Sequence, residues 1–303
     1  MENYIEFKIV YNKEYPDYLG EKFINTNKEK YSLERSSQGD YGYHCKDDGL
    51  FEVILKEAKD KKIIDLSYMF CDCESLISVT ISVFNTKKII NMKCMFYGCK
   101  SLRSVDLTNI NTENVTNMQY MFYGCKSLTS LNLKSFNTKN VTSMYEMFFG
   151  CSSLKYINLS SFNTEKVTDM NSMFFNCSSL ITLNLSSFNV ENVNDFFGMF
   201  DGCCSLKSLT FNNYKSQNAI IMSRMFSNCS SLTTINLSSF NTQNVIDMED
   251  MFNGCSSLTT LDLSSFDITK AKIDGMFSGC KNLLSCGSSD KKIEDEFKKS
   301  KKV

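Results

Sequence analysis

Histidine is almost missing from this sequence, because His44 is the only one among 303 residues. A catalytic triad that uses an imidazole would therefore depend on His44, which lies beside Cys45 in the segment GYHCKDDG. This adjacency is weak evidence for catalysis, because catalytic cysteine and histidine residues usually meet through the fold. Glycine-rich phosphate loops and the zinc motif His-Glu-x-x-His are also missing. These absences predict a protein that is not an enzyme and holds no cofactor.

Excess charge and long apolar runs are lacking as well. Lys and Arg together number 33 and Asp and Glu 34, so the net charge of −1 excludes the basic excess of a nucleic-acid-binding surface. The apolar runs are only a few residues long, which excludes a transmembrane helix. The amino terminus, MENYIEFKIVY, alternates apolar with charged residues and is typical of an amphipathic strand rather than a signal peptide. We therefore expect a cytoplasmic location, with the cell surface, reached by an unrecognised export route, as the alternative.

The chain contains a repeat with a period of 26 residues. The pair Met-Phe recurs at this spacing from Met69 to Met251, and once more at Met276 after a step of 25 residues. The full unit is Cys-x-Ser-Leu-x-x-Leu-Asn-Leu-Ser-Ser-Phe-Asn-Thr-x-Asn-Val-Thr-x-Met-x-x-Met-Phe-x-Gly. A fixed period of this length is typical of a solenoid, in which each unit buries its apolar side chains against its neighbours.

Each repeat combines two shorter periodicities. Leu131 and Leu133 alternate with polar residues, which predicts a short strand with one buried face. The apolar residues from Val141 to Cys151 follow steps of three and four, which predicts an α-helical or 3₁₀ segment. The sequence therefore predicts an α/β repeat, with a parallel sheet on one face of the solenoid and short helical segments on the other.

The segment Asn-Thr-x-Asn-Val-Thr-x-Met-x-x-Met-Phe-x-Gly-Cys resembles the BspA-like leucine-rich repeats in their 26-residue "surface protein" form. The resemblance covers residues 63–286, about three quarters of the chain. It implies a right-handed leucine-rich-repeat solenoid. Members of this family are bacterial and protist proteins, many of them secreted or on the cell surface, and they are associated with adhesion and protein binding.

Three regions follow from these patterns. Residues 1–62 lie outside the repeat and contain two strand-like segments, YIEFKIVY and LFEVILKE, so we expect a small β-rich amino-terminal cap. Residues 63–286 form the solenoid. Residues 287–303 include DKKIEDEFKKSKKV, which predicts a charged closing helix or a frayed tail. A cap is expected at each end because a terminal repeat otherwise exposes its core.

Nine of the 14 cysteines occupy one repeat position. They are Cys73, Cys99, Cys125, Cys151, Cys177, Cys203, Cys229, Cys255 and Cys280. Stacked repeats would place them in a column about 4.8 Å apart with parallel side chains, whereas a disulfide needs converging Cβ atoms. A zinc site is disfavoured because Cys71 and Cys73 form Cys-x-Cys rather than the usual paired knuckle. We predict buried free thiols that fill the core, and no metal site.

The residue between Phe and Gly in Met-Phe-x-Gly provides a candidate binding site. It is aromatic in four successive repeats, as Tyr97, Tyr123, Phe149 and Phe175, and polar in the repeats that follow. Because a core position would stay apolar throughout, we predict a partly exposed aromatic stripe that binds a partner. Two alternatives are that the rings stack on one another or that the amino-terminal region covers them.

The solvent face of the predicted sheet is almost uncharged. Its central column is Thr80, Asp106, Asn132, Asn158, Asn184, Thr210, Asn236 and Asp262. One interpretation is a hydrogen-bonded ladder that supports the sheet, and the other is a surface for a glycan or a polar protein. The predicted function is a monomeric, non-enzymatic scaffold that binds a protein partner at Tyr97, Tyr123, Phe149 and Phe175. The alternative is a surface adhesin that binds a host or matrix protein or a glycan.

Overall fold

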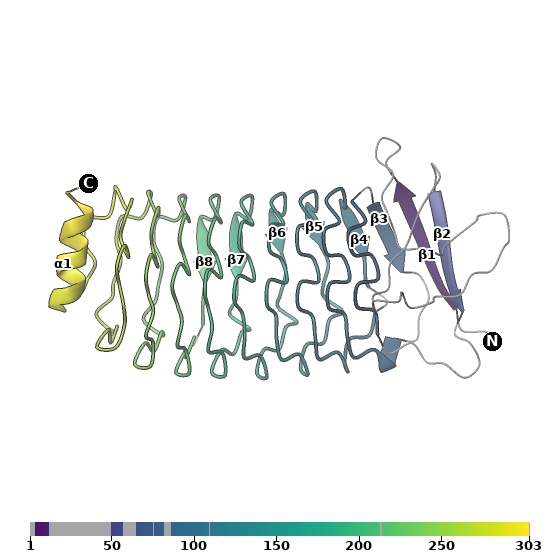
Figure 1. Ribbon diagram of the computed structural model, residues 1–303, viewed down its shortest axis with the longest axis horizontal. Coiled ribbons are helices and arrows are strands. Elements are labelled where there is room, and N and C mark those ends of the chain that lie inside the picture. The colour runs from purple at the N-terminus through teal and green to yellow at the C-terminus, as the bar shows by residue number, and fades with distance from the viewer. Residues whose placement is uncertain are drawn as a thin grey trace.

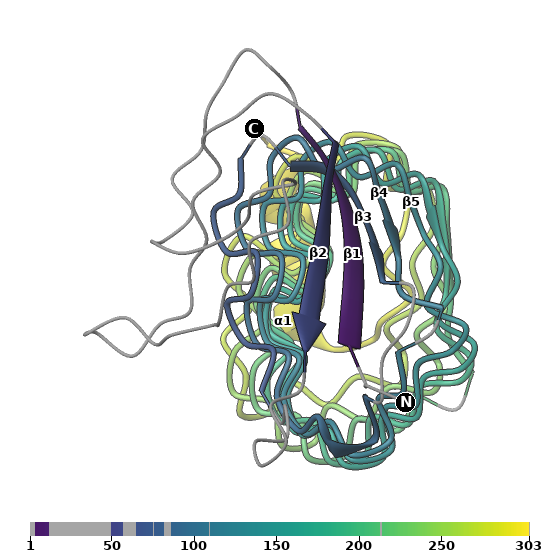
Figure 2. The same cartoon turned by 90° about the vertical axis from the view of Figure 1, so that its right-hand side faces the viewer.

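The computed structural model describes residues 4–11, 50–56, 65–74, 76–81, 86–108, 110–212 and 214–302. The repeats form coils that are stacked along the long axis of the molecule, with the amino-terminal strands at one end and a helix at the other (Figure 1). Seen along this axis, the coils superpose on one another (Figure 2). The chain is therefore a repeat solenoid, as the 26-residue period predicts.

Short parallel strands occupy one side of the coils. Their bounds are β3 Leu76–Ile81, β4 Ser104–Asp106, β5 Ser130–Leu131, β6 Tyr156–Ile157, β7 Thr182–Asn184 and β8 Ser208–Thr210. Strand β3 pairs with β4, β5 with β6 and β7 with β8, each in a register of 26 residues, such as Leu131 opposite Ile157. Leu131 is buried between exposed Ser130 and Asn132, so the alternation predicted from the sequence is confirmed.

The amino-terminal end carries two longer strands. They are β1 Tyr4–Tyr11 and β2 Leu50–Lys56, and they occupy the two segments in which strands are expected. Strand β1 pairs antiparallel with β2 on one side and with β3 on the other, giving the order β2-β1-β3-β4. The first parallel strand of the solenoid therefore has a hydrogen-bonded neighbour.

The expectation of a helical segment in each repeat is wrong. Within the described ranges the only helices are a 3₁₀ turn, η1 Thr86–Lys88, and α1 Lys291–Ser300. In the coil that was expected to be helical, the amide N–H of Phe148 donates to the carbonyl of Met173 at 2.9 Å and that of Gly150 to Phe175 at 2.7 Å. The intervening N–H groups bond three residues back, for example Phe149 to Glu146 at 3.2 Å. Alternate amides thus link the coil to itself and to the next coil.

Left-handed backbone conformations enforce this path. Glu146 has a φ angle of 51° and Gly150 one of 68°, and the equivalent residues in other coils are also left-handed. Two left-handed residues four positions apart interrupt a helix, because a right-handed helix requires negative φ at every position. Isolated parallel bridges run along this side from Asp65 to Lys272, so both sides of the solenoid are hydrogen-bonded between coils.

The phenylalanine of Met-Phe forms the centre of the core. Its rings stack along the solenoid, with Phe122 5.8 Å and Phe174 5.4 Å from Phe148 between ring centroids. The stack comprises Phe70, Phe96, Phe122, Phe148, Phe174, Phe200, Phe226, Phe252 and Phe277. All of these rings are buried, which makes the core one continuous column rather than a series of separate clusters.

The nine-cysteine column is buried throughout. From Cys99 onward each thiol is free and donates from Sγ to the carbonyl of a phenylalanine in the preceding coil. The distance is 3.1 Å from Cys125 to Phe96 and 3.2 Å from Cys151 to Phe122. Burial raises the pKa of Cys151 to about 12, so this thiol stays protonated at neutral pH. The prediction that these cysteines fill the core is confirmed.

The repeated threonine in Asn-Thr-x-Asn links adjacent coils. Thr138 is buried, and its hydroxyl donates to the carbonyl of Asn163 at 2.7 Å and accepts from the Asn163 N–H at 2.8 Å. Two residues later, the side-chain amide of Asn140 donates to the carbonyl of Glu113 in the preceding coil at 2.8 Å. The motif therefore satisfies backbone groups that the turn between the two sides of the coil leaves without a β partner.

We expect the Thr138→Val substitution to lower the free energy of unfolding by about 1–3 kcal/mol, because it removes both hydrogen bonds between the buried Thr138 hydroxyl and the backbone of Asn163. The matched control is Thr142→Val in the same coil, where the hydroxyl is exposed and lies 3.4 Å from the Thr116 carbonyl. The control should change stability by less than about 0.5 kcal/mol. Urea denaturation followed by circular dichroism measures both, and equal losses would contradict the assigned role of Thr138.

The carboxyl-terminal helix α1 closes the solenoid (Figure 1). Asp290 caps its first turn by accepting from the N–H groups of Lys292 and Ile293. Ile293 is fully buried, and the ring of Phe297 meets that of Phe277 edge to face at 5.8 Å between centroids. The sequence left two alternatives for this segment, a closing helix or a frayed tail. The structure shows the helix, over residues 291–300.

Candidate functional site

The predicted aromatic stripe is a stack of four rings, here called the aromatic column. Ring centroids are 4.6 Å apart from Tyr97 to Tyr123, 4.6 Å from Tyr123 to Phe149 and 4.7 Å from Phe149 to Phe175. Each side chain is half-buried. Partial exposure and ring stacking, which the sequence left as alternatives, therefore occur together. The faces of the inner rings lie against each other, so a ligand would meet the ring edges and the phenol groups.

The backbone explains how the column lies outside the core. Phe148 points into the core, Phe149 follows it, and Gly150 is left-handed with a φ angle of 68°. The amide N–H of Gly150 bonds to Phe175 of the next coil, which fixes the distance between successive members of the column. The same geometry recurs at Tyr97 and Gly98.

A hollow of about 630 Å³ runs beside the aromatic column. Its lining residues include Tyr97, Tyr123 and Phe149, together with Lys100 and Lys126. Asp72 and Glu74 also line it, and Glu74 forms an ion pair with Lys100. The hollow thus combines apolar ring edges with charged groups of both signs.

Two further tyrosines, Tyr120 and Tyr145, extend the aromatic surface. The Tyr120 ring lies edge-on to Tyr97 at 6.2 Å and to Tyr145 at 5.1 Å. The Nζ atom of Lys93 lies 5.8 Å from the centroid of Tyr120. Sequence analysis missed this pair because the two residues fall between the methionines of Met-x-x-Met, where neighbouring repeats carry unrelated side chains.

The phenol groups of this surface are held in their protonated form. The pKa of Tyr145 is raised chiefly by a hydrogen bond to Glu146, and burial of the phenol is the second cause. Burial is the main cause of the raised pKa values of Tyr97, Tyr120 and Tyr123. A phenol that stays protonated near neutral pH can donate a hydrogen bond to a ligand.

The aromatic column ends at Asp201, which takes the next position after Phe175. Its carboxylate is buried, lies 2.8 Å from the guanidinium of Arg224 and accepts a hydrogen bond from Asn228 at 3.0 Å. A buried carboxylate requires such partners, because desolvation would otherwise be too costly. The change from rings to a buried carboxylate limits the aromatic column to the amino-terminal half of the solenoid.

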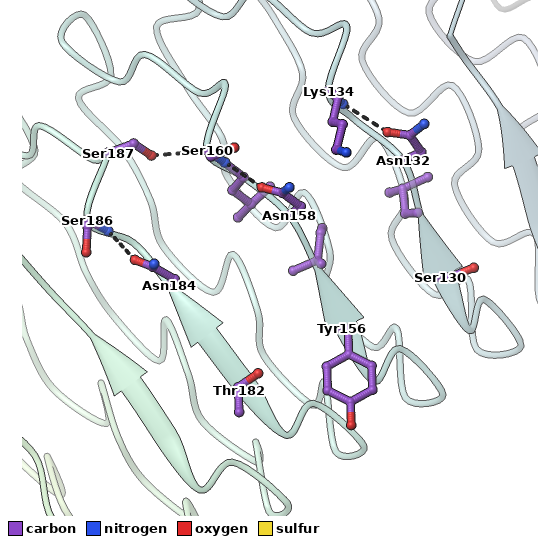
Figure 3. Close-up of a pocket in the computed structure, with 13 residues that line it drawn as sticks. Ser130, Asn132, Lys134, Tyr156, Asn158, Ser160, Thr182, Asn184, Ser186 and Ser187 are labelled. Atoms are coloured by element: carbon purple, nitrogen blue, oxygen red, sulfur yellow. Dashed lines mark hydrogen bonds between the residues drawn. The ribbon is translucent and has the colours of Figure 1, made fainter.

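A second hollow, of about 800 Å³, lies on the sheet face at β5, β6 and β7 (Figure 3). Tyr156 lies within it and is 57% exposed. The side-chain oxygens of Asn132, Asn158 and Asn184 accept from the backbone N–H two residues later, at 3.2, 3.0 and 2.9 Å. These three asparagines thus form turns within their own coils, whereas the ladder interpretation would have used these oxygens between coils.

The described part of the chain provides no group of three or more histidine, cysteine, aspartate or glutamate side chains that could hold a metal ion. His44 and Cys45, the one pair considered for catalysis, lie outside the described residues. In those residues, no helix is long and apolar enough to cross a membrane.

Comparison with known proteins identifies the repeat. A family model described as "Mycoplasma protein of unknown function, DUF285" matches residues 46–155, 128–232 and 206–300. Together the matches span most of the chain. The chain belongs to this family. The matched residues cover the coils of the solenoid together with β2 at one end and α1 at the other.

One solved structure is similar to this DUF285 protein in part. It is the crystal structure of a leucine-rich repeat protein of T. pallidum, with 19% sequence identity and a TM-score of 0.41. The likeness covers 58% of this chain and 74% of the other. None of the curated proteins in the comparison matches the chain.

Proposed function

We propose that this DUF285 protein is a non-enzymatic scaffold, a right-handed leucine-rich-repeat solenoid of the BspA-like type, which binds a protein partner at the aromatic column. The observation that carries the proposal is the difference between the two halves of the solenoid. Four successive coils present half-exposed rings at a position that later coils fill with Asp201, Ser227, Asn253 and Ser278. Core packing does not require rings there, because the later coils have the same buried phenylalanine stack without them.

The chemistry of the hollow suggests the kind of partner. Stacked rings present their edges, which carry partial positive charge, and the phenols of Tyr97 and Tyr123 can donate hydrogen bonds. Lys100 and Lys126 line the same hollow. Asp72 and Glu74 line it as well, and Lys100 is paired with Glu74. These groups suit an extended segment of a partner protein that has an apolar anchor next to charged side chains of both signs. Aromatic residues concentrate binding energy at such interfaces.

The test replaces three rings with the residues that the chain itself uses at this position, as Tyr97→Ser, Tyr123→Asn and Phe149→Ser. The triple variant and the wild-type protein are used as baits in a lysate of the source cells, and captured proteins are quantified by mass spectrometry. We expect at least about a tenfold loss of the proteins that the wild type captures, which corresponds to about 1.4 kcal/mol.

Ile246→Ser is the control, because it removes an exposed apolar side chain that lines neither hollow and leaves the aromatic column intact. It should capture the same proteins as the wild type. Unchanged capture by the triple variant, with its fold retained by circular dichroism, would refute the proposed site. The surface adhesin remains the alternative prediction, and the cytoplasmic location and the monomeric state also stay predictions.

A further inference from the structure

We propose that the hollow around Tyr156 on the sheet face is a second binding site, and that its ligand is a neutral oligosaccharide. The two hollows share no lining residue, so this site is separate from the aromatic column. The inference is independent of the proposed protein partner. It rests on the exposure of one ring, the orientation of three amides and the charge of the lining.

Tyr156 is an exception in its own column. The corresponding residues of other coils are small and hydroxylated, namely Ser104, Ser130, Thr182, Ser208, Thr234 and Thr260. The Tyr156 ring stands over the face of the sheet and is 57% exposed, so it adds little to the core (Figure 3). An exposed aromatic face carries partial negative charge and packs well against the C–H groups of a sugar ring. The exposed ring of Tyr156 is therefore better explained by contact with a ligand than by packing within the solenoid.

Three asparagines that line the same hollow are preorganised as hydrogen-bond donors. Because a backbone N–H donates to the side-chain oxygen of Asn132, Asn158 and Asn184, the oxygen of each amide must face its own coil. The Nδ2 group then faces away from that bond, as a donor for a ligand (Figure 3). The three donors recur once per coil, at the strand spacing of about 4.8 Å. Fixed donors lower the entropic cost of binding.

The remaining lining favours a neutral, hydroxyl-rich ligand. The hydroxyl groups of Ser130, Ser160, Thr182 and Ser186 belong to residues that line the hollow, and each can both donate and accept, whereas that of Ser187 donates to the Leu159 carbonyl at 3.1 Å. Lys134 is the one charged side chain among the described residues that line the hollow. The apolar side chains of Leu131, Ile157 and Leu159 also contribute. An aromatic ring, apolar patches and convergent neutral polar groups are what a chain of uncharged sugars requires.

Isothermal titration calorimetry with the full chain tests the proposal, using cellohexaose, chitohexaose and maltohexaose as probes. We expect at least one hexasaccharide to bind, with an affinity that changes less than about twofold between 0.15 and 1 M NaCl, because salt screens charges and leaves neutral contacts. Tyr156→Ser should weaken binding at least about tenfold. Tyr97→Ser is the matched control and should leave the affinity unchanged.

A second variant, Asn158→Asp, tests the amide donors without removing the turn. Asp106 and Asp262 already occupy this column and accept from the N–H two residues later, at 3.0 and 2.9 Å, so an aspartate fits the fold. It exchanges the outward donor for an acceptor, and binding should fall about tenfold. The proposal is overturned if none of the probes binds at about 10 mM, or if neither variant weakens binding. Binding of a heparin hexasaccharide alone, abolished by 1 M NaCl, would also overturn it, in favour of an anion site at Lys134.

Discussion

Replacing Phe148 by alanine is expected to lower the free energy of unfolding by about 3–5 kcal/mol. The ring is fully buried and stacks on Phe122 and Phe174, so its loss opens a cavity in the middle of the continuous core column. The coils on either side cannot collapse into the space, because hydrogen bonds on both sides of the solenoid hold their separation. The loss of unfolding free energy should therefore lie near the upper end of the range that is typical when a large core residue is replaced by a small one.

The adjacent residue provides the control. Phe149→Ala removes a ring of the same size from the aromatic column, where it is half-buried and stacks on Tyr123 and Phe175. It should cost only about 1–2 kcal/mol, because less apolar surface is lost and water can enter the space. Urea denaturation curves of the two variants measure the difference. Equal losses of unfolding free energy would show that the two stacks contribute equally to stability. That result would contradict the separation of the Phe148 stack, which stabilises the core, from the aromatic column, which is proposed to bind a partner.

Replacing Ile293 by aspartate is expected to release α1 and expose the end of the core. Ile293 is fully buried, and a carboxylate placed there would lie against the last coil near buried Glu296. Burying an unpaired charge costs several kcal/mol, and this penalty opposes docking of the ten-residue helix. We expect loss of hydrogen-exchange protection over residues 291–300, together with self-association of the protein, since Phe277 would lose its cover.

Lys291→Asp is the control for this variant. Lys291 is exposed in the first turn of α1, where a negative charge interacts favourably with the helix dipole. Its hydrogen exchange and sedimentation should match those of the wild type. If Ile293→Asp also sediments like the wild type, with α1 still protected, then α1 is not the element that closes the core.

The sequence predicted the solenoid, the core and the aromatic column because all three follow from the repeat period. A shift of 26 residues places like residues above one another, so the Phe148 stack, the Cys151 column and the Tyr97 stripe could each be assigned from the sequence. Tyr120, by contrast, belongs to no repeated pattern. Its place beside Tyr97 depends on the left-handed conformation of its backbone, with a φ angle of 58°.

The predicted helical segment failed for a specific reason. Steps of three and four residues between Val141 and Cys151 fit a helix, but they also fit a chain of turns that buries the same side chains. Gly150 is compatible with a left-handed conformation, yet Glu146, Arg224 and Asp250 occupy the other left-handed position. Glycine occupies this position in two coils, as Gly198 and Gly275, but other residue types fill it in the remaining coils, so the sequence contained only a weak signal for this path.

The sequence alone determined two features of the protein. The 26-residue period fixes the register in which successive coils stack, and the pattern of apolar residues fixes which side chains face the core. Only the tertiary structure decided the path of the backbone on the turn side. A left-handed glutamate or arginine costs about 1 kcal/mol or more in isolation. Hydrogen bonds to the next coil, such as that from Phe148 to Met173, offset this cost, and they exist only once the neighbouring coil is in place.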